Sequence, residues 1–269
     1  MFSFSVKILI TSIINTINSN VLTFIIGHKF PMAAVGNFTQ ANKWNTMAYS
    51  TISGTIEQVA QPVLAQITDD NEREKRVFRK LMRFTAFFSF PALFGLSLVS
   101  QEFILLTIGE KWAECIPMLQ VLCIGGAFFA FNTMYQQLAI SSGRSDIYMW
   151  CNIVQIILQI ALILVSCNYG IFTMVIAYTV FSILWLGVWQ WQAHRIIGLR
   201  LRDALSDTMP FMLSAAAVMV ATYFITLPIM NLWLLFPLRI IIASALYFAI
   251  MKIANAEILN ECIRFVRKK

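Results

Sequence analysis

Charged residues are scarce in this sequence, in which Asp, Glu, Lys and Arg together make up only 12% of the 269 residues. Soluble domains usually carry about 25% charged residues and about 45–50% apolar ones. Here 59% of the residues are hydrophobic and the mean hydropathy is +0.73. A soluble core of this size cannot bury so much apolar surface, so the composition indicates an all-α integral membrane protein with several spans.

Residues that build metal, redox and catalytic sites are also few. The chain has two histidines and five cysteines, and the cysteines form neither a CxxC pair nor a cluster with histidine. It contains no P-loop, no Asp-x-Asp metal motif and no recognisable Ser/His/Asp set. We therefore expect no catalytic residue, no metal site, no cofactor and no enzymatic activity.

The net charge of +7 comes from basic residues that gather at the ends of apolar segments. Nucleic-acid binding is therefore not expected, because membrane topology explains this placement better. The densest cluster lies between two membrane-length segments and resists translocation, which predicts a cytoplasmic position. Its six basic residues are Arg73, Lys75, Arg76, Arg79, Lys80 and Arg83.

Eight stretches are long and apolar enough to be membrane helices, since a span needs about 20 mostly apolar residues. They are 5–27, 43–67, 84–108, 117–140, 147–167, 170–192, 209–228 and 235–254. The first six predict a transmembrane lobe over 1–192, and the last two predict additional helices over 193–254.

Alternation of these spans puts both termini on the cytoplasmic side, together with sixteen of the 20 basic residues. Four basic residues remain on the other side: Lys29, Lys43, Lys111 and Arg239. We expect Arg239 to snorkel outward, and we expect Glu102 to lie at the outer interface.

The tail over 255–269 predicts a short amphipathic helix. Apolar residues recur at helical spacing (Ile258, Leu259, Cys262, Ile263 and Val266), with Arg264, Arg267, Lys268 and Lys269 around them. Such a helix is expected to lie on the anionic inner leaflet of the phospholipid bilayer.

Polar side chains form stripes on four of the predicted spans, where lipid alone would not favour them. The stripes contain Ser12, Asn15, Ser19 and Thr23; Thr46, Ser50, Ser53, Glu57 and Gln61; Asn132 and Gln136; and Asn152, Gln155 and Gln159. Two interpretations stay open. The stripes together favour a hydrophilic cavity that binds a sugar-like ligand, whereas any single residue, taken alone, favours hydrogen bonding between membrane helices.

Glu57 is the one acidic residue predicted deep within a span. A carboxylate at that depth must be protonated, paired or exposed to water. It is therefore the candidate for proton or cation coupling.

Several segments resemble the oligosaccharide flippases of bacterial polysaccharide biosynthesis, which belong to the multidrug, oligosaccharidyl-lipid and polysaccharide exporter superfamily. The resemblance covers about 20–150, in the family's order and spacing. Its segments include INSNVLTFIIGHKF (17–30), GNFTQANKW (36–44), QPVLAQITDD (61–70), FRKLMRF (78–84), FPALFGL (90–96), IGEKW (108–112) and SGRSD (142–146).

This resemblance implies a multi-pass protein of the bacterial inner membrane that moves undecaprenyl-diphosphate-linked oligosaccharide by alternating access, without ATP, for lipopolysaccharide O-antigen, capsule or exopolysaccharide export. The family has two helical lobes and 12 to 14 spans, and this chain resembles the second lobe only. The resemblance therefore implies either a fragment that needs an N-terminal lobe or an assembly of two copies. Cationic residues meet the diphosphate in this family, and Arg83 is the nearest candidate, although it equally serves as a topology anchor.

Other functions remain open. A cation-coupled multidrug exporter of the same superfamily would require Glu57. An inactive truncated membrane protein would transport nothing alone. An integral-membrane sugar polymerase is disfavoured, because the sequence predicts no large periplasmic loop.

Overall fold

A computed structural model describes residues 25–67, 70–254, 258, 259 and 261. These residues form helices and connections, with no strand among them. The long helices, in chain order, are α2 (Met32–Ala65), α3 (Asn71–Leu98), α5 (Ile116–Ser141), α6 (Ser145–Ser166), α7 (Ile171–Ile197), α8 (Leu201–Thr226) and α9 (Leu232–Ile253). Shorter helices are α4 (Ser100–Thr107), η1 (Glu110–Cys115) and η2 (Cys167–Tyr169).

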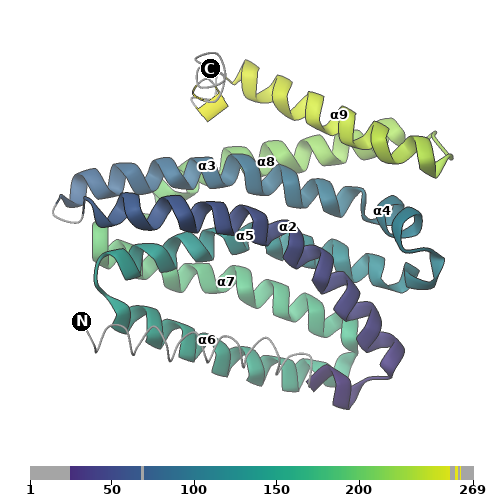
Figure 1. Cartoon of the computed structure of the whole chain (residues 1–269), viewed down its shortest axis with the longest axis horizontal. Coiled ribbons are helices and arrows are strands. Elements are labelled where there is room, and N and C mark those ends of the chain that lie inside the picture. The colour runs from purple at the N-terminus through teal and green to yellow at the C-terminus, as the bar shows by residue number, and fades with distance from the viewer. Residues whose placement is uncertain (1–24, 68–69, 255–257, 260, 262–269) are drawn as a thin grey trace.

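The helices run up and down in an elongated bundle, shown in Figure 1. Helix α5 lies in the middle and contacts α2, α3 and α7, while α8 packs on α3 and α9 packs on α8. The α2–α3, α5–α6 and α7–α8 connections lie at one end of the bundle, and α9 runs toward that end. These are the segments that the charge pattern placed on one side of the membrane. We call this end, which carries Arg73–Arg83, the basic end; its cytoplasmic orientation stays a prediction.

Local sequence signals explain where several helices begin and end. Asp70 caps α3, because its Oδ1 accepts a hydrogen bond of 3.0 Å from the backbone N–H of Arg73. Helix α7 ends before Gly198, which adopts a left-handed conformation (φ 66°) and donates its N–H to the carbonyl of His194. Glycine tolerates this conformation without a Cβ clash.

Two adjacent glycines let α5 occupy the centre of the bundle. A Cβ on Gly126 would collide with Oδ1 of Asn45 on α2, and a Cβ on Gly125 would lie 2.9 Å from Cγ2 of Thr179 on α7. Small residues allow membrane helices to approach closely without a large apolar driving force. The Gly125–Gly126 pair therefore makes room for neighbours on two sides of α5.

The chain is an all-α membrane protein, and the predicted spans are largely confirmed. Six helical segments among the described residues are long and apolar enough to cross a membrane: 71–98, 110–141, 145–169, 171–197, 201–226 and 232–253. The predicted span 43–67 falls on α2, which is 34 residues long but does not meet that criterion of apolarity. The predicted span 5–27 lies almost wholly outside the described residues.

The predicted continuous span over 84–108 is wrong in one respect, because the helix breaks at Val99 and resumes as α4. Two hydroxyls on either side of the break bond to backbone carbonyls. Ser100 Oγ donates to the carbonyl of Ser97 at 2.8 Å, and Ser97 Oγ donates to the carbonyl of Gln120 on α5 at 3.2 Å. Serine hydroxyls bonded to the backbone are known to bend helices.

The apolar face of the tail does not face lipid where it is described. Ile258 and Leu259 are buried in the protein, at 1% and 3% exposure. Glu261 pairs with Lys80 on α3 at 2.7 Å. The rest of 255–269 lies outside the described residues, and its contact with the anionic leaflet stays a prediction.

Candidate functional site

The predicted polar stripe on α2 divides between two environments. Ser50, Glu57 and Gln61 are exposed, whereas Ser53 is buried at 6% exposure. The buried Oγ of Ser53 has no hydrogen-bond partner in the described part of the chain. The expectation that all of these residues share one open face is therefore wrong for Ser53, because α2 turns that position toward the interior of the lobe.

Glu57 does not lie alone on α2. Its Oε1 accepts a 3.1 Å hydrogen bond from Nε2 of Gln137 on α5, while the Glu57 side chain stays exposed on its other side. Gln137 itself is buried at 5% exposure, and its Oε1 has no partner among the described residues. The Glu57 carboxylate is thus hydrogen-bonded to α5 on one side and exposed on the other side.

Gln137 was not among the residues predicted for the site. The predicted stripe on α5 followed Asn132 and Gln136, which lie four positions apart. One sequence signal could have identified Gln137. Adjacent residues of a helix point in directions about 100° apart, so the amides of Gln136 and Gln137 can reach two different neighbouring helices. The structure bears this out, because Gln137 meets α2 and Gln136 meets α6.

The stripes on α5 and α6 partly bond to each other. Gln136 Nε2 donates to Asn152 Oδ1 at 3.4 Å, and Asn152 Nδ2 donates to the carbonyl of Tyr148 at 2.7 Å. Asn132 and Gln159 are buried, and Gln155 is half-buried. These contacts fit the interhelical hydrogen bonding that the sequence left open as an alternative. The remaining predicted positions, Asn15 and Ser19, lie outside the described residues.

Arg83 belongs to an ion-pair cluster between α3 and α8 at the basic end. Asp207, which is buried at 6% exposure, receives a 2.6 Å bond from Arg79 Nε, and Arg83 Nε lies 3.8 Å from its other oxygen. Asp203 lies 3.8 Å from Arg79 Nη1. Arg83 is therefore positioned by a carboxylate of α8, and its role toward a diphosphate stays a prediction.

The predictions for Arg239 and Glu102 are wrong. Arg239 does not snorkel outward, and Glu102 is not interfacial; their exposures are 7% and 1%. Arg239 Nη1 donates to Glu102 Oε1 at 2.6 Å, and its Nε donates to Thr226 Oγ1 at 3.1 Å. Helix α9 packs against α4 and α8, and this packing brings the guanidinium to the Glu102 carboxylate. The hydropathy of a single helix cannot reveal a partner on another helix.

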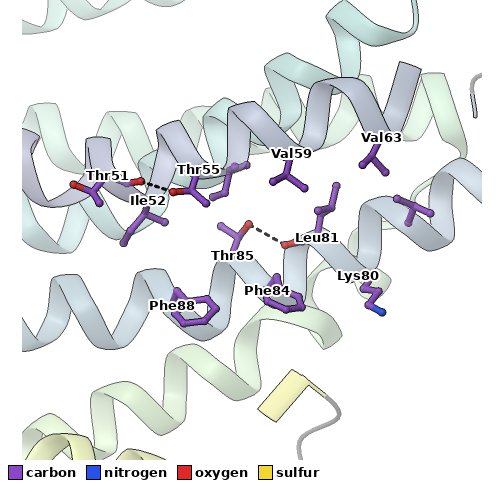
Figure 2. Close-up of a pocket in the computed structure, with 12 residues that line it drawn as sticks. Thr51, Ile52, Thr55, Val59, Val63, Lys80, Leu81, Phe84, Thr85 and Phe88 are labelled. Carbon is purple, nitrogen blue, oxygen red and sulfur yellow. Dashed lines mark hydrogen bonds between the residues drawn. The ribbon is translucent and has the colours of Figure 1, made fainter. Parts of the chain in front are cut away.

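An apolar groove opens between α2 and α3 toward the basic end, with a volume of about 570 Å³. Figure 2 shows Val59 and Val63 on α2 facing Leu81 and Phe84 on α3 across it. We call this feature the α2–α3 groove. No group of three or more His, Cys, Asp or Glu side chains that could hold a metal occurs in the part of the chain described by the structure.

Comparison with known proteins confirms the resemblance predicted from the sequence. The family described as "Polysaccharide biosynthesis protein" matches residues 1–117. Lipopolysaccharide biosynthesis protein WzxC of Escherichia coli is 32% identical over 155 residues, which cover 58% of this chain and 32% of WzxC. Teichuronic acid biosynthesis protein TuaB of Bacillus subtilis is 27% identical over 222 residues, covering 82% of this chain and 46% of TuaB.

The fold is similar to that of a solved flippase. The structure of lipid II flippase MurJ in an inward closed conformation matches with a TM-score of 0.75 and 14% identity. The match covers 94% of this chain and 53% of that one. The chain thus has a fold similar to part of MurJ and is a multi-pass protein of the bacterial inner membrane, and it spans about a third to a half of the length of these relatives.

Proposed function

We propose that this chain forms one lobe of a flippase that moves a polyprenyl-diphosphate-linked oligosaccharide across the inner membrane by alternating access. The observation that carries this proposal is the exposed polar face of α2, with Glu57 held by Gln137 of the core helix, in a lobe of exporter fold. A helix surrounded only by lipid has no physical reason to present such a face. The names of the relatives, which refer to lipopolysaccharide and teichuronic acid biosynthesis, support a saccharide cargo.

The exposed groups on α2 suit a neutral, hydroxyl-rich cargo. Gln61 offers an amide, and Ser50, whose hydroxyl donates to the carbonyl of Met47 at 3.3 Å, still offers an acceptor oxygen. Both groups can bond to sugar hydroxyls without requiring a charge on the cargo. Glu57 is the group that we assign to proton or cation coupling. Arg83, held at the basic end beside Asp207, is the group that we assign to the diphosphate. This chemistry is transport, and no catalytic residue is assigned.

Alternating access requires a second wall for the cavity, since the cargo passes between two lobes that rock against each other. We infer that a further lobe faces α2, either an N-terminal lobe of a longer protein or a second copy of this chain. The coverage of about a third to a half of the relatives supports the first arrangement.

A second candidate function is cation-coupled export of drugs, and the exposed carboxylate of Glu57 is the observation that favours it. A third candidate is a lobe that transports nothing by itself. Complementation of a flippase-deficient strain separates the three. Restored surface polysaccharide supports the flippase, restored drug resistance without polysaccharide supports the drug exporter, and complementation by this chain alone contradicts the inactive lobe.

A further inference from the structure

The α2–α3 groove is long, narrow and open along one side of the bundle. Its α2 wall extends from Thr51 to Val63, about 18 Å at 1.5 Å per residue. Its α3 wall extends from Val77 to Phe88, a similar length. Both walls belong to helices of the membrane bundle, so the groove lies within reach of lipid chains.

The lining of the groove is apolar even where the sequence is polar. Thr55 Oγ1 donates to the carbonyl of Thr51, and Thr85 Oγ1 donates to the carbonyl of Leu81, both at 2.9 Å. Figure 2 shows these two bonds, each of which joins residues of one helix. The hydroxyls are satisfied internally, so methyl and methylene groups and the ring of Phe88, which is 47% exposed, line the space.

Lys80 is the one charged group among the described residues that line the groove, and it lies near the basic end (Figure 2). Its Nζ lies 2.7 Å from Oε1 of Glu261, and the two side chains are 50% and 34% exposed. Ion pairs as exposed as this one contribute little to stability, so the carboxylate can exchange with another anion. The buried side chains of Ile258 and Leu259 hold the segment that brings Glu261 to this position.

We propose that the α2–α3 groove binds one acyl chain of an anionic phospholipid, whose phosphate takes the place of the Glu261 carboxylate on Lys80. The volume of about 570 Å³ is of the order of one acyl chain and is far too small for a whole long polyprenyl cargo. An apolar slot that ends in an ammonium complements a lipid with an anionic head. The Glu261 carboxylate and the lipid phosphate then compete for the same cation.

This proposal goes beyond the proposed cargo and does not depend on it. It is tested on the full chain in vesicles with phosphatidylglycerol that carries a diazirine in its acyl chain. After illumination, the labelled peptides are mapped by mass spectrometry. We expect label on 51–63 and 77–88 and more label in Glu261→Gln. Lys80→Gln should show about fivefold less label, the factor for loss of one partly exposed ion pair of about 1 kcal/mol.

Matched controls make the test decisive. Arg76→Gln removes the same charge from an exposed position one turn away on α3, and its labelling should stay near that of the unmodified protein. Thr55→Trp fills the groove without changing any charge and should abolish the label. Phosphatidylcholine with the same diazirine should label weakly and should not respond to Lys80→Gln.

Three results would overturn the proposal. One is equal loss of label in Lys80→Gln and Arg76→Gln, which would mean that the lipid is attracted by general surface charge. Another is full labelling of Thr55→Trp, which would place the lipid elsewhere. The third is the absence of label from 51–63 and 77–88 in the unmodified protein, which would show that no acyl chain occupies the groove.

Discussion

Arg239 on α9 and Glu102 on α4 form a buried ion pair with an N–O distance of 2.6 Å, although 137 positions separate them in the sequence. Arg239 Nε also donates to Thr226 Oγ1 on α8, and its Nη1 also donates to the carbonyl of Leu98. One side chain therefore joins the additional helices α8 and α9 to the end of α3 and to α4. This contact orients α8 and α9 against α3 and α4.

Removal of one partner of this pair should destabilise the protein strongly. We expect Arg239→Met to cost about 3–5 kcal/mol, because it leaves the Glu102 carboxylate buried without its counter-charge. Thermal unfolding of the purified protein in detergent, followed by size-exclusion chromatography with fluorescence detection, measures the effect.

Two further variants control this prediction. The double variant Glu102→Leu with Arg239→Met should recover most of the loss, since replacing a whole buried ion pair by apolar side chains is often neutral. Arg202→Met, at an exposed position on α8, should have little effect. Equal unfolding temperatures for Arg239→Met and Arg202→Met would contradict the account.

The helices could be predicted from sequence because each membrane span is a local property of about 20 residues. The prediction of 117–140 lies within one residue of α5 at each end. The pair of Glu102 and Arg239 could not be predicted in this way, because hydropathy treats each residue by its depth along one helix. The depth of Arg239 suggested snorkelling, whereas the tertiary packing of α9 on α4 supplies a carboxylate.

The reactivity of introduced cysteines should distinguish the exposed positions of the α2 stripe from the buried one. In a variant without the native cysteines, Ser50→Cys and Gln61→Cys should react with a water-soluble maleimide in membranes, because both positions are exposed. Ser53→Cys should be protected, because Ser53 is buried between helices at 6% exposure. Gln155→Cys should react at an intermediate rate. Protection of both Ser50→Cys and Gln61→Cys would contradict a water-filled cavity in front of α2.

The close approach of α2 and α5 should depend on Gly126. We expect Gly126→Ala to destabilise the protein by about 1–3 kcal/mol, because the new methyl group overlaps the side chain of Asn45. Gly54→Ala is the matched control on α2, since nothing lies within 4 Å of its added Cβ. That control should be neutral or slightly stabilising, as alanine favours helix. Equal destabilisation by both variants would show that helix packing is not the cause.

Coupling through Glu57 predicts a selective loss of transport. In the full-length protein, Glu57→Gln should lower polysaccharide export and leave the amount of protein in the membrane unchanged, because the amide can still bond to Gln137 but cannot carry a charge or a proton. Glu110→Gln, at an exposed position in η1, is the control and should export normally. Unchanged export by Glu57→Gln would remove this residue from the coupling mechanism.

The candidate site was only partly predictable. A polar stripe identifies a helix that avoids lipid, which is why Glu57 and Gln61 could be singled out from spacing alone. The stripe does not show which side chains face a neighbouring helix and which face open space. Ser53 and Asn152 face neighbours, and this depends on how α2 and α6 pack around α5. Gln136 and Gln137 are adjacent in the sequence, but which of the two meets α2 depends on that packing.

Movement of the cargo itself tests the central claim most directly. The full-length protein would be reconstituted in vesicles together with a fluorescent polyprenyl-diphosphate-linked oligosaccharide, and the labelled sugar would be followed with a quencher that does not cross the membrane. The account predicts that the sugar moves between leaflets, that the movement is lost when the α2 face is blocked at Gln61, and that a cationic drug is not transported. Transport of the drug without the oligosaccharide, or no transport of the oligosaccharide at all, would contradict it.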